Sequence, residues 1–122
     1  MRGNGLKLLI ATILVANSNL VFGQSKLTTD QTILYSNEGK FQLASLDSIK
    51  VYTTIDNSSL DVYKVIQKIE ESTISDKKLI VRILEMHATK EAKLNELLNL
   101  SQTYKEVNTI LREELILNLN KN

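Results

Sequence analysis

The sequence predicts a mainly α-helical domain with a minor β component, preceded by a cleaved signal peptide. Three observations lead to this fold class. A short apolar run follows the amino terminus, β-favouring residues surround a glycine at position 39, and the stretch from Lys40 to Asn122 contains neither glycine nor proline. Because tight turns usually require one of these two residues, the long stretch without them favours helices over a sheet.

Residues 1–23 have the layout of a secretory signal. Arg2 and Lys7 supply the positive charge that stays on the cytoplasmic side. Residues 8–16 form a run that is apolar except for Thr12, and at about 1.5 Å per residue it covers less than half of a ~30 Å hydrocarbon core. The run therefore suits a signal peptide and is too short for a stable membrane span.

The predicted cleavage site follows the signal directly. Val21 and Gly23 are small residues at the positions that a signal peptidase accepts, which predicts cleavage between Gly23 and Gln24. We expect a periplasmic or secreted protein from a Gram-negative bacterium. Cleavage after Ser18, an uncleaved anchor and a buried amino-terminal helix are the alternatives. The chain has no cysteine, which excludes a lipid-modified cysteine as an anchor.

The composition restricts the classes of function. Removing the 23-residue signal leaves 99 of the 122 residues, which is one small domain. Loss of Arg2 and Lys7 leaves 13 of the 15 basic residues beside 14 acidic ones, so the mature chain is close to neutral. Nucleic-acid binding requires clustered Lys and Arg, so we expect no nucleic-acid partner. Without disulfides, stability has to come from an aliphatic core or a partner subunit.

Residues 24–58 carry the predicted strands. Short β-favouring runs within residues 32–44 flank Gly39, and a positive φ at this glycine would suit a hairpin turn. Residues 48–55 alternate in pattern and are rich in β-branched side chains, which predicts a further strand. The segment is thus a β-hairpin or a three-stranded meander. A short helix over residues 46–54 is the alternative.

Residues 59–122 form the predicted helical region of the same small domain. Residues 56–59, with the sequence DNSS, supply side-chain oxygens that cap the start of a helix. The first helix is expected to end near Ser72. Its apolar stripe consists of Val62, Val65, Ile66 and Ile69.

A second helical pattern extends from Asp76 to Leu119, with apolar residues every three or four positions. One continuous helix of this extent is about 65 Å long, whereas the first helix covers only about 20 Å of it. We therefore predict a stripe that a partner has to cover, as a coiled coil or antiparallel helical dimer. A break near Asn99 to Thr103, giving a compact all-α bundle, is the alternative. The interaction stripe comprises Leu79, Ile83, Met86, Leu94, Leu97, Leu100, Tyr104, Val107, Leu111 and Leu115.

The sequence offers no catalytic, cofactor-binding or metal-binding constellation. His87 is the single histidine, and Glu91 follows it at helical spacing, but two ligands are too few for a zinc site. Nucleophilic catalysis needs an activated side chain with a base, and no glycine-rich loop presents either a nucleophile or a phosphate cradle. We expect a protein that is not an enzyme and holds no cofactor.

These observations favour an exported, non-enzymatic helical protein that acts by self-association or by binding another cell-envelope protein. We expect a homo-oligomer or an envelope partner, and no stable membrane span after signal cleavage. A periplasmic chaperone-like or small-ligand-binding module is the alternative. The tripeptide at residues 47–49 also resembles the pattern at which some Gram-negative bacteria O-glycosylate exported proteins, which would require an exposed Ser48.

Overall fold

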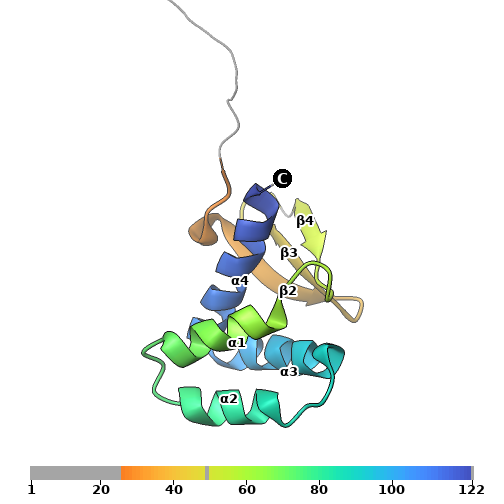
Figure 1. The fold of residues 1–122 in the computed structure, drawn as a ribbon. Coiled ribbons are helices and arrows are strands. Elements are labelled where there is room, and N and C mark those ends of the chain that lie inside the picture. The colour runs from red at the N-terminus through yellow and green to blue at the C-terminus, as the bar shows by residue number, and fades with distance from the viewer. Residues whose placement is uncertain (1–25, 49, 122) are drawn as a thin grey trace, which may run out of the picture.

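The computed structural model describes residues 26–48 and 50–121 (Figure 1). The predicted signal peptide, with its cleavage site at Gly23 and Gln24, lies outside the described residues. Within them a small antiparallel sheet precedes four helices, so the fold is α+β with helices predominating. The elements are the 3-10 turn η1 (Thr29–Gln31), the strands β2 (Thr32–Asn37), β3 (Lys40–Ser45) and β4 (Val51–Thr54), and the helices α1 (Val62–Glu71), α2 (Lys77–Glu85), α3 (Lys90–Thr103) and α4 (Lys105–Asn120).

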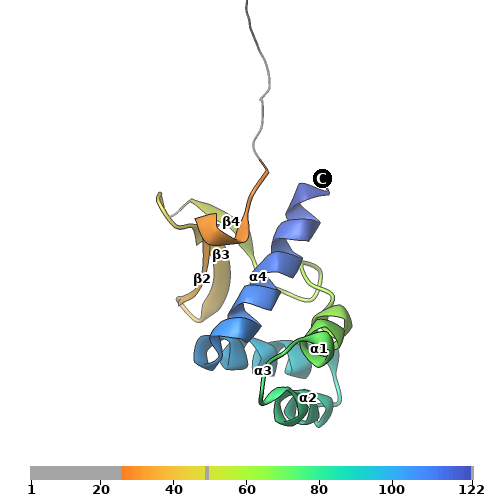
Figure 2. The same cartoon turned by 90° about the vertical axis from the view of Figure 1, so that its left-hand side faces the viewer.

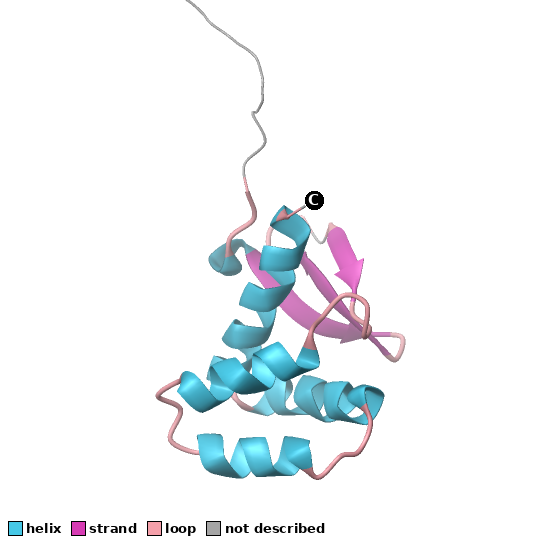
Figure 3. Ribbon diagram, in the orientation of Figure 1, coloured by secondary structure: helices cyan, strands magenta, loops and turns pink. Residues whose placement is uncertain are grey.

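The three strands pair antiparallel in chain order, which confirms the predicted meander (Figure 3). Glu38 and Gly39 form the turn between β2 and β3, and both have positive φ, at 52° and 76°. Two positive φ values match the twist of the paired strands. Leu34 and Leu43 are cross-strand partners and both are buried. Figure 2 shows the sheet on one side of α4 and α1 on the other.

Helix α1 confirms the first predicted helix. All four apolar positions of its predicted stripe are buried. The Asp61 carboxylate caps the helix by accepting hydrogen bonds from the N–H groups of Tyr63 (3.1 Å) and Lys64 (3.2 Å). The helix starts later than we predicted from residues 56–59. The Asp56 carboxylate instead accepts hydrogen bonds from the N–H groups of Ser58 and Ser59 and closes a local turn. Its last residue, Glu71, directly precedes the expected end at Ser72.

The prediction of one continuous helix from Asp76 to Leu119 is wrong. Helices α2, α3 and α4 occupy this segment, with breaks at residues 86–89 and at Tyr104. The second break directly follows Asn99 to Thr103, where the alternative prediction placed it. The all-α bundle of that alternative is also incorrect, because the sheet forms part of the core.

The break between α2 and α3 has caps on both sides. Thr89 Oγ1 accepts a hydrogen bond from the Ala92 N–H at 3.0 Å and begins α3. The Lys93 ammonium donates to the Leu84 carbonyl at 3.3 Å and to the His87 carbonyl, at the carboxyl-terminal end of α2. A cation at that end offsets the helix dipole. These groups stabilise the reversal of the chain.

The break between α3 and α4 is a single extended residue. Tyr104 has φ −109° and ψ 113°, and its N–H still donates to the Leu100 carbonyl at 2.8 Å. Asn108 Nδ2 donates to the Ser101 carbonyl at 3.1 Å, which provides a partner for a carbonyl at the end of α3. Arg112 Nε in turn donates to Asn108 Oδ1 at 2.8 Å.

Arg112 also fastens α4 to the start of the sheet. Its Nη1 donates to the carbonyls of Thr29 at 2.7 Å and Thr32 at 2.8 Å. Burial lowers the pKa of Arg112 from its ordinary value. Near the end of α4, the Asn120 amide accepts from the Leu27 N–H and donates to the Leu27 carbonyl. The first described residues are therefore held against the last helix.

Candidate interaction surface

Most of the predicted interaction stripe is covered by the protein itself. Because the chain folds back twice, α3 and α4 direct their apolar residues into the same core as the sheet and α1. Tyr104 is half-buried and packs against this core. The six buried members of the stripe are Leu94, Leu97, Leu100, Val107, Leu111 and Leu115.

The α2 part of the stripe stays on the surface. Leu79 is 50% exposed and Met86 is 77% exposed, with the half-buried Ile83 between them. Met86 directly follows α2 and keeps helical φ and ψ (−68° and −21°), so spacings of four and three residues place the three side chains on one face. We call these three residues the α2 surface. The opposite face of α2 packs into the core through Ile80, Val81 and Leu84.

The position of α2 explains this exposure. Figure 1 shows α2 at the end of the molecule farthest from the sheet, and its contacts are with α1 and α3. A helix packed on one face leaves the other to solvent, where polar residues are the usual choice. The grouping of Leu79, Ile83 and Met86 on that outward face makes it a candidate contact surface.

One flank of the α2 surface carries charges of both signs. At about 100° per residue, Lys78, Arg82 and Glu85 lie on the same side of the apolar face. None of the three forms an ion pair with another described residue. Their charges are therefore available to a partner that lies on α2.

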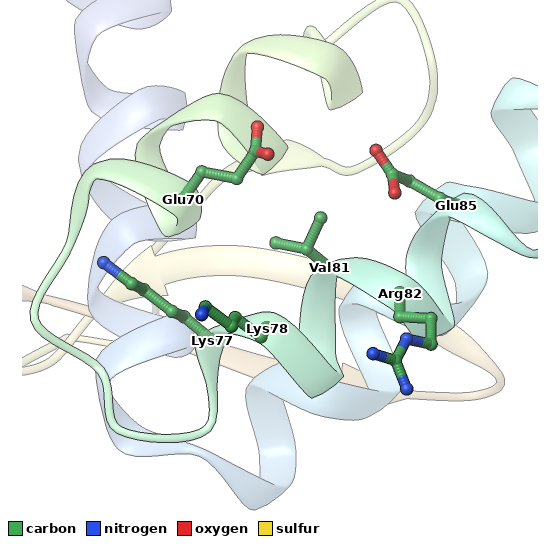
Figure 4. A pocket seen from close by; sticks show the side chains of 6 residues that line it. All are labelled: Glu70, Lys77, Lys78, Val81, Arg82 and Glu85. Carbon is green, nitrogen blue, oxygen red and sulfur yellow. The ribbon is translucent and has the colours of Figure 1, made fainter.

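The same flank borders an open groove of about 510 Å³ between α1 and α2 (Figure 4). Lys77 also lines the groove, and its ammonium donates to the Ser72 carbonyl at 2.8 Å. The groove is open, and its lining holds no serine, threonine, cysteine or histidine that could form a nucleophile–base pair. Its lining consists of Glu70, Lys77, Lys78, Val81, Arg82 and Glu85.

His87 does not pair with Glu91. Because α2 ends at Glu85, His87 lies in the connection and the helical spacing to Glu91 is lost. Its Nε2 is instead 3.3 Å from Glu96 Oε1, so this contact joins the connection to α3. Among residues 26–48 and 50–121, no three His, Cys, Asp or Glu side chains are grouped as a metal site.

A second, smaller apolar row crosses the sheet. Ile33, Ala44 and Val51 are cross-strand neighbours, and Ile33 and Val51 are each more than 40% exposed. Antiparallel sheets commonly leave one face to solvent, so this row needs no partner. Ser48 lies in the exposed turn before β4, as its predicted modification requires, whereas Ile49 lies outside the described residues.

Comparisons with protein-family models, with curated proteins and with solved structures give no match to this chain. In the part of the chain that the structure describes, no helix has the length and apolar character needed to cross a membrane. The α2 surface and its charged flank are therefore the starting point for function.

Proposed function

We propose that this protein is exported and acts without catalysis, by binding another protein chain through the α2 surface. The observation that carries this proposal is the exposure of Leu79 and Met86 on a helix whose other face is fully packed. A self-contained fold does not need apolar residues at these positions. Burial of these side chains against a binding partner would contribute favourable free energy to the complex.

The size of the surface indicates reversible association. Complete burial of an aliphatic side chain is worth about 1.5–3 kcal/mol. The exposed parts of Leu79 (50%) and Met86 (77%) together amount to little more than one whole side chain. The gain per copy is then about 2–4 kcal/mol, which is modest beside the entropic cost of association. This favours a transient contact over an obligate one.

A photo-crosslinking experiment in the native cell tests this proposal. The full-length gene, with its own leader, encodes a benzoylphenylalanine in place of Met86. The matched control carries the same group in place of Asn95, an exposed polar residue of α3. We expect protein adducts from position 86 and few or none from position 95.

The absence of adducts at position 86 would overturn the proposal. Equal labelling at both positions would indicate non-specific contact and would also count against it. The intact mass of the exported chain checks the export step, because cleavage should leave Gln24 as the first residue. A chaperone-like module would instead give many adducts of unrelated mass.

A further inference from the structure

We propose that the partner of the α2 surface is a second copy of this chain, docked antiparallel about a two-fold axis close to Arg82 and Ile83. The inference rests on the proposed function, since it names the occupant of the same surface. The argument comes from the order of apolar and charged residues along α2.

The apolar residues of α2 match themselves when a second α2 runs in the opposite direction. Leu79 of one copy then lies level with Met86 of the other, and the two Ile83 side chains meet near the axis. Two-fold interfaces are the commonest in protein oligomers and require such self-complementarity. The shorter Leu79 side chain faces the longer and more adaptable Met86, which fills gaps well.

The charged flank matches itself in the same arrangement. A two-fold axis across an antiparallel helix pair brings the same flank of each helix together. Along this flank the basic Lys78 and Arg82 come first and the acidic Glu85 follows. When one copy runs in the opposite direction, its Glu85 lies about two residues from the level of Lys78 in the other copy. This offset is about 3 Å along the helix axis. Both long side chains span that offset.

This pattern favours a second copy over a partner of one charge sign. A purely acidic helix or an anionic membrane would attract Lys78 and Arg82 but repel Glu85. In the antiparallel copy each Glu85 lies about two residues from both Lys78 and Arg82 of the other chain, so both acidic side chains gain basic partners. The two Arg82 side chains lie near the axis, where these glutamates offset their mutual repulsion. In the described part of the chain these side chains have no ion pair to break first.

The contact is small, which sets the expected strength. Helix α2 has nine residues and is about 13 Å long. A stable interface usually covers about 800 Å² on each partner, which is more than three side chains and their flank provide. We therefore expect a weak dimer whose population rises with concentration.

A charge-swap experiment tests the arrangement with the exported chain. Lys78→Glu sets glutamates against Glu85 of the other copy, and Glu85→Lys sets lysines against Lys78. Either variant alone should dimerise about tenfold more weakly in sedimentation equilibrium, because two exposed pairs change sign. An equimolar mixture of the two variants should recover the wild-type association, since every cross pair is again of opposite charge.

Lys40→Glu is the matched control, because it makes the same charge change at an exposed position on β3, and it should leave association unchanged. A mixture no stronger than the single variants would overturn the antiparallel arrangement. A wild-type chain that stays monomeric at millimolar concentration would overturn the second copy as partner. Adducts of other mass at position 86 would then still support the proposed function, whereas no adducts at all would overturn both.

Discussion

Lys93 is a buried cation, and its replacement should destabilise the connection between α2 and α3. Its side chain is largely buried, with 8% of the residue exposed, and its ammonium donates to the carbonyls of Leu84 and His87. Lys93→Met keeps the length of the apolar stem and removes the donor. Both carbonyls then lose a charged partner at the end of α2.

The magnitude follows from two opposing effects. A hydrogen bond to a charged group contributes about 1.5–3 kcal/mol, and a cation at a helix carboxyl end about 0.3–1 kcal/mol. Methionine avoids the cost of burying the ammonium, which offsets part of that loss. We expect a decrease of about 2 kcal/mol in the free energy of unfolding. For a domain of this size, that corresponds to a melting temperature about 8–16 °C lower.

Urea unfolding followed by far-ultraviolet circular dichroism measures this decrease directly. Lys105→Met is the matched control, because Lys105 is exposed and its ammonium forms no hydrogen bond or ion pair with another described residue. The control should change stability by less than about 0.5 kcal/mol. Equal effects of the two substitutions would refute the argument that Lys93 holds the reversal in place.

Two other changes test the rest of the fold. Arg112→Met should lower the free energy of unfolding by about 2–4 kcal/mol in the same urea assay, because the carbonyl of the buried Thr32 loses its charged donor. A decrease of less than about 0.5 kcal/mol would contradict this. Hydrogen bonds from the hydroxyl of Ser58, and then from the N–H groups of Ser59 and Ser58, lower the pKa of Asp56 from its ordinary value of 3.8. The folded state therefore gains stability above that value and loses it as the pH falls through the lower folded-state pKa. Asp56→Asn removes this carboxylate, so the free energy of unfolding should fall less steeply as the pH is lowered. An unchanged dependence on pH would show that the Asp56 turn does not cause the loss of stability in acid.

The sheet and the first helix were predictable because their signals are local. Gly39 lies between two β-favouring runs, and a hairpin turn with positive φ needs such a residue. The apolar positions of α1 share one face and are followed by a serine that ends the helix. Only the start was misplaced, since residues 56–59 and Asp61 are all good caps, and sequence alone does not decide between them.

The long helix was predicted wrongly because its periodicity continues through both breaks. Thr89, with Glu91 in the following turn, is a recognisable helix start that the uninterrupted stripe concealed. At Tyr104 no glycine or proline marks the break, and the only local signal is the run of weaker helix formers from Asn99 to Thr103 that precedes it. The Asn108 amide donates to the Ser101 carbonyl across the junction, and Arg112, which also lies in α4, holds the Asn108 side chain in place. Local propensity indicated this position but did not decide between a break and a continuous helix.

The fold-back changes which part of the stripe has to be explained. A continuous helix would have required a partner along its whole length, whereas the observed chain covers α3 and α4 itself. Within the predicted stripe, the apolar side chains that stay on the surface are those of the α2 surface. Periodicity identified these residues but could not assign them to an internal or external contact. Leu79 and Met86 therefore remain the residues through which the function of this protein is best approached.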